Sequence, residues 1–380
     1  MSGKDDQSKG AKKSALHLRK GVRGGHDGLP AIPREGAGPE AESSAPQSQS
    51  GSKERRMIDT AKYVEGVLAG DRTMLARAIT LVESNAPAHF EQAQAVIKEL
   101  LPHTGQSIRV GVTGVPGAGK STLIEALGTH LTERGHRVAV TAVDPSSSIS
   151  GGSILGDKTR MEHLAADQRA FIRPSPTGGT LGGVTRKTRE TVLLFEAAGY
   201  DLVLIETVGV GQSEILVRSM VDFFLLVLIS GAGDELQGIK KGVIEIADAI
   251  LINKADGDNM ISAQAARGEY ERALHYLRPA TEGWQTPALA ASAYTGEGIS
   301  ELWGVIMKFR DATQARGVFA ERRRGQELDW VHSLVRERLW DLFQAHEGIA
   351  KILPELEDAV IRGDLPATSA AARLISEFKV

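Results

Sequence analysis

Residues 114–122 read Gly114-Val115-Pro116-Gly117-Ala118-Gly119-Lys120-Ser121-Thr122. They follow an apolar run over 108–113 that predicts a β-strand, and they precede a helical pattern over 123–134. Glycines let a backbone curl until its N–H groups face an anion, and the start of a helix adds the positive end of its dipole. The stretch therefore predicts a phosphate-binding P-loop, in which Lys120 reaches the β- and γ-phosphates and the Ser121 hydroxyl binds Mg²⁺.

A second motif, Asn253-Lys254-Ala255-Asp256, follows the apolar run over 249–252 and is expected at the end of another strand. There the Asp256 carboxylate accepts two hydrogen bonds, from the N1–H and the exocyclic amine of guanine. The stem of Lys254 covers the ring, and Asn253 ties the loop back to the P-loop. Adenine lacks this pair of donors, so the motif predicts GTP and GDP as the nucleotides and disfavours ATP.

The strand expected over 202–205 ends at Glu206-Thr207-Val208-Gly209-Val210-Gly211-Gln212. Glu206 takes the position where an acidic residue holds Mg²⁺, directly or through water. The N–H of Gly209 is expected to approach the γ-phosphate. Signalling GTPases carry a water-orienting glutamine directly after this glycine, where Val210 stands here. The motif therefore predicts slow intrinsic hydrolysis that a partner accelerates.

Two further assignments each leave an alternative open. Ser292 and Ala293 follow the strand expected over 287–291, and their N–H groups are assigned to guanine O6, although such a pair is common in ordinary connections. Asp144 follows the strand expected over 138–143 and is either a ligand of Mg²⁺ or its water, or a helix N-cap. All three residues are expected at the nucleotide edge of the sheet.

Two glycine-rich, charged segments over 151–161 and 231–242 are not typical of generic P-loop proteins. The first suits a loop that closes over Mg²⁺ and phosphate when GTP is bound. Together with the P-loop and the motifs over 206–212 and 253–256, these segments closely resemble the G3E-type GTPases of the MeaB/ArgK/MMAA family. The resemblance runs from about residue 68 to about residue 343.

The resemblance implies a GTPase that serves as a chaperone of adenosylcobalamin-dependent acyl-CoA mutases, chiefly methylmalonyl-CoA mutase, and gates the loading of their cofactor. By resemblance, the Mg²⁺ ligands are Ser121, Asp144, Asp157 and Glu206. The family's third switch loop contains Asp234, Gln237 and Lys240, which contact with the mutase would bring to the nucleotide as catalytic groups beside Lys120 and Glu206. From the residues alone, Lys240 and Lys241 fit the start of a solvated helix equally well.

Strand and helix patterns alternate along the middle of the chain. Strands are expected near 108–113, 138–143, 169–173, 202–206, 223–229, 249–253 and 287–291. This alternation predicts an α/β P-loop NTPase fold, with a mainly parallel sheet covered by helices on both faces and the nucleotide above its carboxyl edge. N-terminal helices and a C-terminal helical arm are expected in addition.

Four segments follow from these patterns: a tail over 1–56, N-terminal helices over 57–103, the P-loop GTPase domain over 104–316 and a helical arm over 317–380. The tail is rich in Gly, Ser, Pro, Lys and Gln and is expected to be disordered. It is either an extension without function, with Met57 as the true start, or a tether.

The C-terminal arm carries an apolar stripe at helical spacing, formed by Leu328, Val331, Leu334, Val335, Leu339, Leu342 and Phe343. Such a stripe must be buried, either on its own domain or in a homodimer, and the resemblance favours the homodimer. Arg322, Arg323 and Arg324 precede the stripe and are expected to form a solvated patch.

Composition excludes several classes of function. The chain has no cysteine, which rules out disulfides, thiolate catalysis and cysteine metal sites. Its net charge is −3 with no sustained basic face, so nucleic acid is not an expected partner. The longest apolar run, over 223–229, is too short to span a membrane, and a cytoplasmic location is expected.

Two other functions remain as alternatives. One is a nucleotide-dependent kinase or regulator of an amino-acid transport system, which would transfer phosphate to protein rather than to water. The other is a module that holds GTP without turnover. Assays for phosphorylated protein and for released phosphate separate them from a GTPase.

Overall fold

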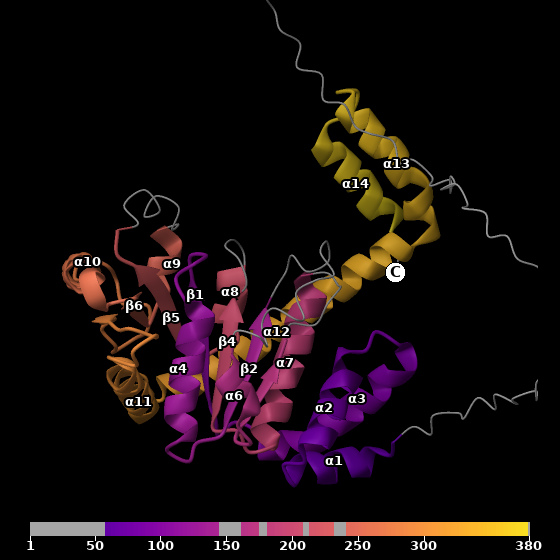
Figure 1. The fold of residues 1–380 in the computed structure, drawn as a ribbon. Helices are drawn as coiled ribbons and strands as arrows, with labels where there is room; N and C mark the ends of the chain where they lie inside the picture. The colour runs from indigo at the N-terminus through magenta and orange to yellow at the C-terminus, as the bar shows by residue number, and fades with distance from the viewer. Residues whose placement is uncertain (1–57, 144–160, 175–180, 208–212, 232–240, 379–380) are drawn as a thin grey trace, which may run out of the picture. The chain divides into compact units, whose positions relative to one another are not determined.

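The computed structural model describes residues 58–143, 161–174, 181–207, 213–231 and 241–378 of the chain (Figure 1). The tail over 1–56, which the sequence predicts to be disordered, lies outside these residues. Strands and helices alternate from residue 108 to residue 315, as the sequence pattern predicts.

The central element is a sheet of seven strands that all run parallel, in the order β3-β2-β4-β1-β5-β6-β7. The strands are β1 (Ile108–Gly114), β2 (Val138–Val143), β3 (Ala170–Arg173), β4 (Leu202–Thr207), β5 (Phe223–Ile229), β6 (Ala249–Asn253) and β7 (Ala288–Ala290). Each lies where the sequence predicts a strand. The predicted α/β fold with a parallel sheet is therefore confirmed.

Both faces of the sheet are buried, because successive side chains of each strand enter different cores. In β4, Leu202 and Leu204 belong to one core, while Val203 and Ile205 belong to the other. The first core is shared with α4 (Lys120–Thr132), α6 (Glu162–Ala166) and α11 (Ile299–Ala315). The second face is covered by α7 (Leu181–Ala197), α8 (Ser213–Arg218), α9 (Lys241–Glu245) and α10 (Met260–Leu274). Figure 1 shows α4 and α7 beside the strands that they cover.

Three N-terminal helices extend the second core: α1 (Thr60–Leu68), α2 (Arg72–Glu83) and α3 (Pro87–Leu100). Asp71 caps α2, because its side chain accepts hydrogen bonds from the N–H groups of Thr73 and Met74. The amide of Gln94 donates to the buried Glu190 of α7 over 2.8 Å. The three helices are thus part of the core that covers this face of the sheet.

An aspartate precedes each of β4, β5 and β6 and accepts a hydrogen bond from a backbone N–H at the start of a neighbouring strand. These pairs are Asp201 with the N–H of Arg137 (2.9 Å), Asp222 with that of Arg109 (2.8 Å) and Asp248 with that of Phe224 (2.9 Å). N–H groups at the amino edge of a parallel sheet have no strand partner there, so carboxylates satisfy them. Asp222 and Asp248 are buried, whereas Asp201 is exposed.

The expected solvated patch over Arg322–Arg324 is wrong for two of its three members. The side chains of Arg322 and Arg323 are only 15% and 13% exposed. Arg323 binds both oxygens of Asp222, at 2.7 and 2.6 Å, and donates to the carbonyls of Gly105 and Ser107. The carboxylates of the sheet edge need cations, and the first turns of α12 (Val318–Ala345) supply them.

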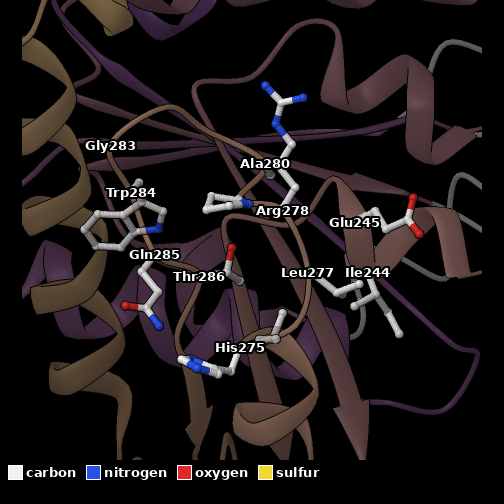
Figure 2. Close-up of a pocket in the computed structure, with 12 residues that line it drawn as sticks. Ile244, Glu245, His275, Leu277, Arg278, Ala280, Gly283, Trp284, Gln285 and Thr286 are labelled. Carbon is white, nitrogen blue, oxygen red and sulfur yellow. The ribbon is translucent and has the colours of Figure 1, made fainter.

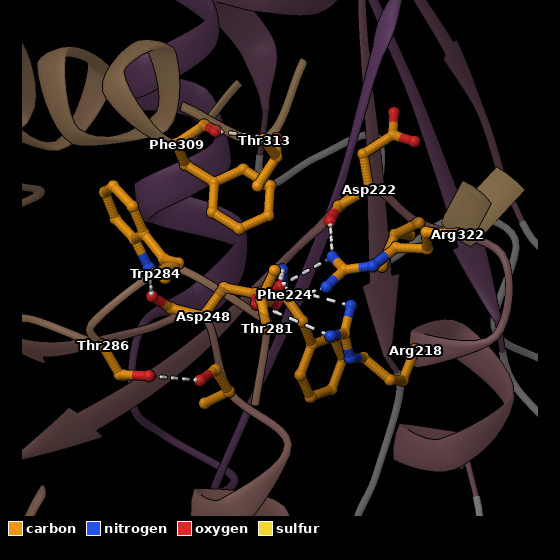
Figure 3. Close-up of polar contacts among 12 residues, drawn as sticks. Arg218, Asp222, Phe224, Asp248, Thr281, Trp284, Thr286, Phe309, Thr313 and Arg322 are labelled. Carbon is orange, nitrogen blue, oxygen red and sulfur yellow. Dashed lines mark hydrogen bonds and ion pairs between the residues drawn. The ribbon is translucent and has the colours of Figure 1, made fainter. Parts of the chain in front are cut away.

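Asp248 is fully buried and lies between two arginines from different helices (Figure 3). Arg218 of α8 approaches its carboxylate to 3.2 Å and Arg322 of α12 to 3.4 Å. The hydroxyl of Thr281 also donates to it. This cluster joins α8, α12 and the segment before β7 at the amino edge of the sheet.

Beyond its first turns, α12 exposes an apolar stripe. Leu328, Val331, Val335, Leu339 and Leu342 of α12 are all between 46% and 63% exposed among the described residues. Two further helices follow, α13 (Glu347–Ile361) and α14 (Ala367–Glu377). The ring of Phe378, just after α14, lies 5.3 Å from that of Phe343 in α12. No helix among the described residues has both the length and the apolar composition needed to cross a membrane.

Arg323→Ala should lower the free energy of unfolding by about 3 kcal/mol, because it leaves the buried Asp222 carboxylate without its cation. Urea unfolding followed by circular dichroism measures this loss.

Arg324→Ala is the matched control, since Arg324 is exposed on the same helical turn. It should change the free energy of unfolding by about 0.5 kcal/mol or less. Equal losses in the two variants would contradict the buried pair.

Candidate functional site

The candidate site lies at the carboxyl edge of the sheet, where parallel strands bring their ends together. Gly114 ends β1, Thr207 ends β4 and Asn253 ends β6. The P-loop connects β1 to α4, which begins at Lys120. Motifs that are far apart in the sequence therefore meet at one edge.

Two glycines of the P-loop are required by their surroundings. Gly114 has φ +150°, and a Cβ there would lie 2.0 Å from the carbonyl oxygen of Val227 in β5. Gly119 is left-handed at φ +83°, and a Cβ there would lie 2.7 Å from Nδ2 of Asn253. Only glycine allows this path without displacing β5 or Asn253.

Lys120 is only 9% exposed. Its Nζ donates to the carbonyls of Gly114 (2.9 Å) and Val115 (3.3 Å). Burial is the largest influence on its pKa and lowers it, while the carboxylates of Glu206 and Glu214 oppose that shift. A phosphate bound at the loop would favour the charged form of this ammonium.

The two oxygen groups that the sequence assigns to Mg²⁺ lie next to this lysine. The Ser121 hydroxyl donates to Oε1 of the buried Glu206 over 2.9 Å. At the same end of β4, the hydroxyl of Thr207 donates to that of Thr113 in β1 over 2.9 Å. Hydroxyl and carboxylate groups are hard oxygen donors, which Mg²⁺ prefers. Ser121 and Glu206 together therefore fit that ion.

Asn253 joins the P-loop to the loop after β7. Its Nδ2 donates to the carbonyl of Ala118 over 2.7 Å, and its Oδ1 accepts from the N–H of Ala293 over 3.1 Å. The side chain is almost fully buried and uses both ends of its amide. The two loops are therefore held in one relative position.

Asp256 is held by a side chain rather than by the backbone of the loop after β7. The buried Ser292 donates its hydroxyl to Oδ2 of Asp256. The N–H of Ser292 donates to the carbonyl of Glu297 over 2.9 Å, and that of Ala293 is taken by Asn253. Both N–H groups that the sequence assigns to guanine O6 thus already have partners in the chain.

Several predicted site residues lie outside the described residues: Asp144, Asp157, Gly209, Asp234, Gln237 and Lys240. Sequence reasoning also missed Glu214 in α8, a carboxylate that is 6% exposed and acts on the pKa of Lys120. Its signal was its place just after the motif over 206–212, in the first turn of the helix that follows β4.

A pocket of about 370 Å³ lies away from this edge, between α9, α10 and the segment before β7 (Figure 2). Trp284 and Thr286, which line it, donate to the carbonyls of Asp248 and Ala247 at the amino end of β6. In Figure 2 its charged side chains, Arg278 and Glu245, do not point toward each other. The pocket shows no converging polar groups of a binding site.

Comparison with known proteins agrees with this geometry. Residues 75–348 match the family described as methylmalonyl-CoA mutase-associated GTPase MeaB. A protein of Caulobacter vibrioides named as a GTPase is 56% identical over 321 residues, which cover 84% of this chain and 98% of that one. A mouse protein named methylmalonic aciduria type A homolog, mitochondrial, is 47% identical over 337 residues, covering 86% of this chain and 81% of that one. A crystal structure described as a LAO/AO transport system kinase has a TM-score of 0.70 at 39% identity, covering 84% of this chain and 98% of that one.

Lys120→Ala should lower the affinity for GTP and GDP by about a hundredfold, because it removes the charged donor at the phosphates. Displacement of a fluorescent GDP analogue by GTP or GDP measures the affinity of the variant for each nucleotide.

Lys308→Ala on α11 is the control, since Lys308 is exposed. The P-loop assignment is wrong if the Lys120 variant binds as tightly as this control.

Proposed function

Because the chain belongs to the MeaB family of methylmalonyl-CoA mutase-associated GTPases, we propose that it uses GTP binding and hydrolysis to control an adenosylcobalamin-dependent acyl-CoA mutase. As a member of this family it is a GTPase that binds guanine nucleotides. The observation that carries the proposal is the pair of hydrogen bonds made by the Asn253 amide. They hold the predicted phosphate loop, residues 114–122, against residues 253–256, the loop predicted to bind the base and called the base loop below.

We assign the phosphates to residues 114–122, with Gly209 at the γ-phosphate. In support, Lys120 is a buried cation whose nearest hydrogen-bond partners are neutral carbonyls. A carbonyl is a weaker partner for an ammonium than a phosphate oxygen. Binding of the nucleotide would draw Nζ from these carbonyls toward the phosphates.

The base is assigned to Asn253, Lys254 and Asp256, with Ser292 and Ala293 as their support. The Ser292 hydroxyl on Oδ2 orients the Asp256 carboxylate, so that it presents an acceptor edge to the donors of guanine. Ala293 acts through Asn253, to which its N–H is bound. In this assignment the loop after β7 fixes the acceptor rather than contacting the base oxygen directly.

The proposed Mg²⁺ ligands are Ser121 and Glu206, together with Asp144 and Asp157 from outside the described residues. The first two already lie within 2.9 Å of each other. Bound there, the ion would neutralise charge on the phosphates. Glu206 is buried, so a cation next to it would also compensate its charge.

The catalytic groups are proposed to be incomplete in the chain alone. Val210 replaces the glutamine that orients water in signalling GTPases. Asp234, Gln237 and Lys240 are proposed to complete the site beside Lys120 and Glu206 when the partner binds. In this proposal, hydrolysis of GTP is slow until the mutase binds, so the rate of hydrolysis depends on the presence of the partner.

The proposed partner is a mutase of the methylmalonyl-CoA type, and hydrolysis would gate loading of adenosylcobalamin and protect the enzyme. Support comes from the family description and from the name of the mouse relative. The cytoplasm is the proposed location, although that relative is named mitochondrial.

A homodimer is proposed to form through the arm over 317–380. The exposed apolar stripe of α12, from Leu328 to Leu342, supports it, because such a surface is costly to leave in water. The other proposed segments are the tail over 1–56, the helices over 57–103 and the GTPase domain over 104–316.

A second candidate is a kinase or regulator of an amino-acid transport system. The similarity to a structure described as a transport system kinase favours it. It requires phosphate to appear on protein, so incubation with radiolabelled GTP and a transport protein would separate it from hydrolysis.

GTP hydrolysis should be slow for the chain alone and rise at least about tenfold with a methylmalonyl-CoA mutase from the same source, because the partner completes the catalytic groups. Phosphate release measures both rates, with ATP as the control nucleotide. Hydrolysis indifferent to the mutase would leave the GTPase but refute this partner.

Asp256→Asn should shift preference from guanine toward xanthine nucleotides by about tenfold or more, because the amide donates where the carboxylate accepts. Competition between GDP and xanthosine diphosphate measures the ratio. Full guanine preference in this variant would contradict the base assignment.

A further inference from the structure

Lys254, in the proposed base loop, has an unusual backbone conformation. Its φ is +60°, and among the described residues it is the one non-glycine residue with positive φ. A side chain at such a position costs free energy, so the surrounding structure must hold it there. Its neighbour Asp256 makes the proposed contacts with the base, which ties this conformation to recognition.

The peptide between Lys254 and Ala255 is held at both ends. The Lys254 carbonyl accepts a hydrogen bond from Nδ2 of Asn259 over 2.6 Å. The N–H of Ala255 donates to the carbonyl of Ala291 over 3.1 Å. Because both bonds act on one planar amide, they set its orientation and hence the direction in which the chain enters Asp256.

The Asn259 amide is itself fixed. Its Oδ1 accepts from the hydroxyl of Ser230, directly after β5, over 2.7 Å. Its backbone N–H donates to the carbonyl of Asp256 over 3.0 Å. Since the Lys254 carbonyl can only accept, Nδ2 must face it and Oδ1 must face Ser230. Asn259 thus anchors the base loop to the end of β5.

An ordinary role for an asparagine here would be to cap a helix. Asn259 stands at the N-cap of α10, but its side chain makes no capping hydrogen bond. The amide instead points back to Lys254 and Ser230. The side chain therefore serves the loop before the helix rather than the helix.

We propose that Asn259 is a positioning residue for base specificity, which holds Lys254 in its left-handed conformation and so places Asp256 toward the base. This role rests on the proposed guanine site. Asn259 acts only through the loop, so losing its donor should weaken recognition of guanine more than binding of the phosphates.

The test compares the affinities of the full chain for GDP and for ADP, measured by displacement of a fluorescent GDP analogue. Asn259→Asp keeps the shape but replaces the donor with an acceptor that faces the Lys254 carbonyl. GDP affinity should fall about tenfold while the weak ADP affinity stays unchanged, so that the preference for guanine over adenine narrows about tenfold.

Asp258→Asn is the matched control, because Asp258 is exposed in the same loop. Ser230→Ala removes only the second anchor and should narrow the guanine preference about threefold. The Ser230→Ala variant also keeps the proposal testable if the Asn259→Asp variant fails to fold.

Full guanine preference in both Asn259→Asp and Ser230→Ala would overturn the positioning role and leave the base site standing. An equal fall in GDP and ADP affinity, with a lower melting temperature, would overturn it as well, because that pattern marks a general structural role. A wild-type chain without guanine preference would refute the base site itself.

Discussion

The parallel direction of all seven strands is the constraint on which the rest of the structure depends. It gathers every strand carboxyl end at one edge of the sheet and every amino end at the other. Backbone N–H and C=O groups at both edges lack partners in a neighbouring strand and need other hydrogen-bond partners, which differ between the two edges. At the amino edge the chain supplies the partners itself. At the carboxyl edge lie the P-loop, Glu206 and the loop over 253–256 that is proposed to bind the base.

The amino edge uses charge to attach helices to the sheet. Asp222 and Asp248 accept from strand N–H groups and at the same time bind arginines from α8 and α12. Buried pairs of this kind are poor evidence for net stability, because desolvation offsets most of their attraction. Each buried carboxylate does need a particular arginine, and this need fixes the position of the first turns of α12. The apolar stripe farther along the same helix stays exposed.

The carboxyl edge is organised by two asparagines, each of which uses both ends of its amide. Asn253 links the P-loop to the loop after β7, and Asn259 links the base loop to the end of β5. Such bonds add little net stability, but they have a defined geometry. They place Lys254 and Asp256 relative to Lys120 before any ligand arrives, which lowers the cost of ordering on binding.

The sequence by itself determined the features that depend on neighbours along the chain. Strand and helix patterns predicted all seven strands, and the motifs at 114–122 and 253–256 predicted which residues meet at the carboxyl edge, because a parallel sheet leaves no other place for them. Only the tertiary structure decided how distant side chains pair. Arg323 and Asp222 are 101 positions apart, so nothing local distinguishes that buried arginine from the exposed Arg324 beside it. Ser292 and Asp256, 36 positions apart, likewise meet only after folding. The physical reason is that periodicity reports which face of an element is apolar, whereas the partner of a buried polar group depends on which elements the fold brings within hydrogen-bonding distance.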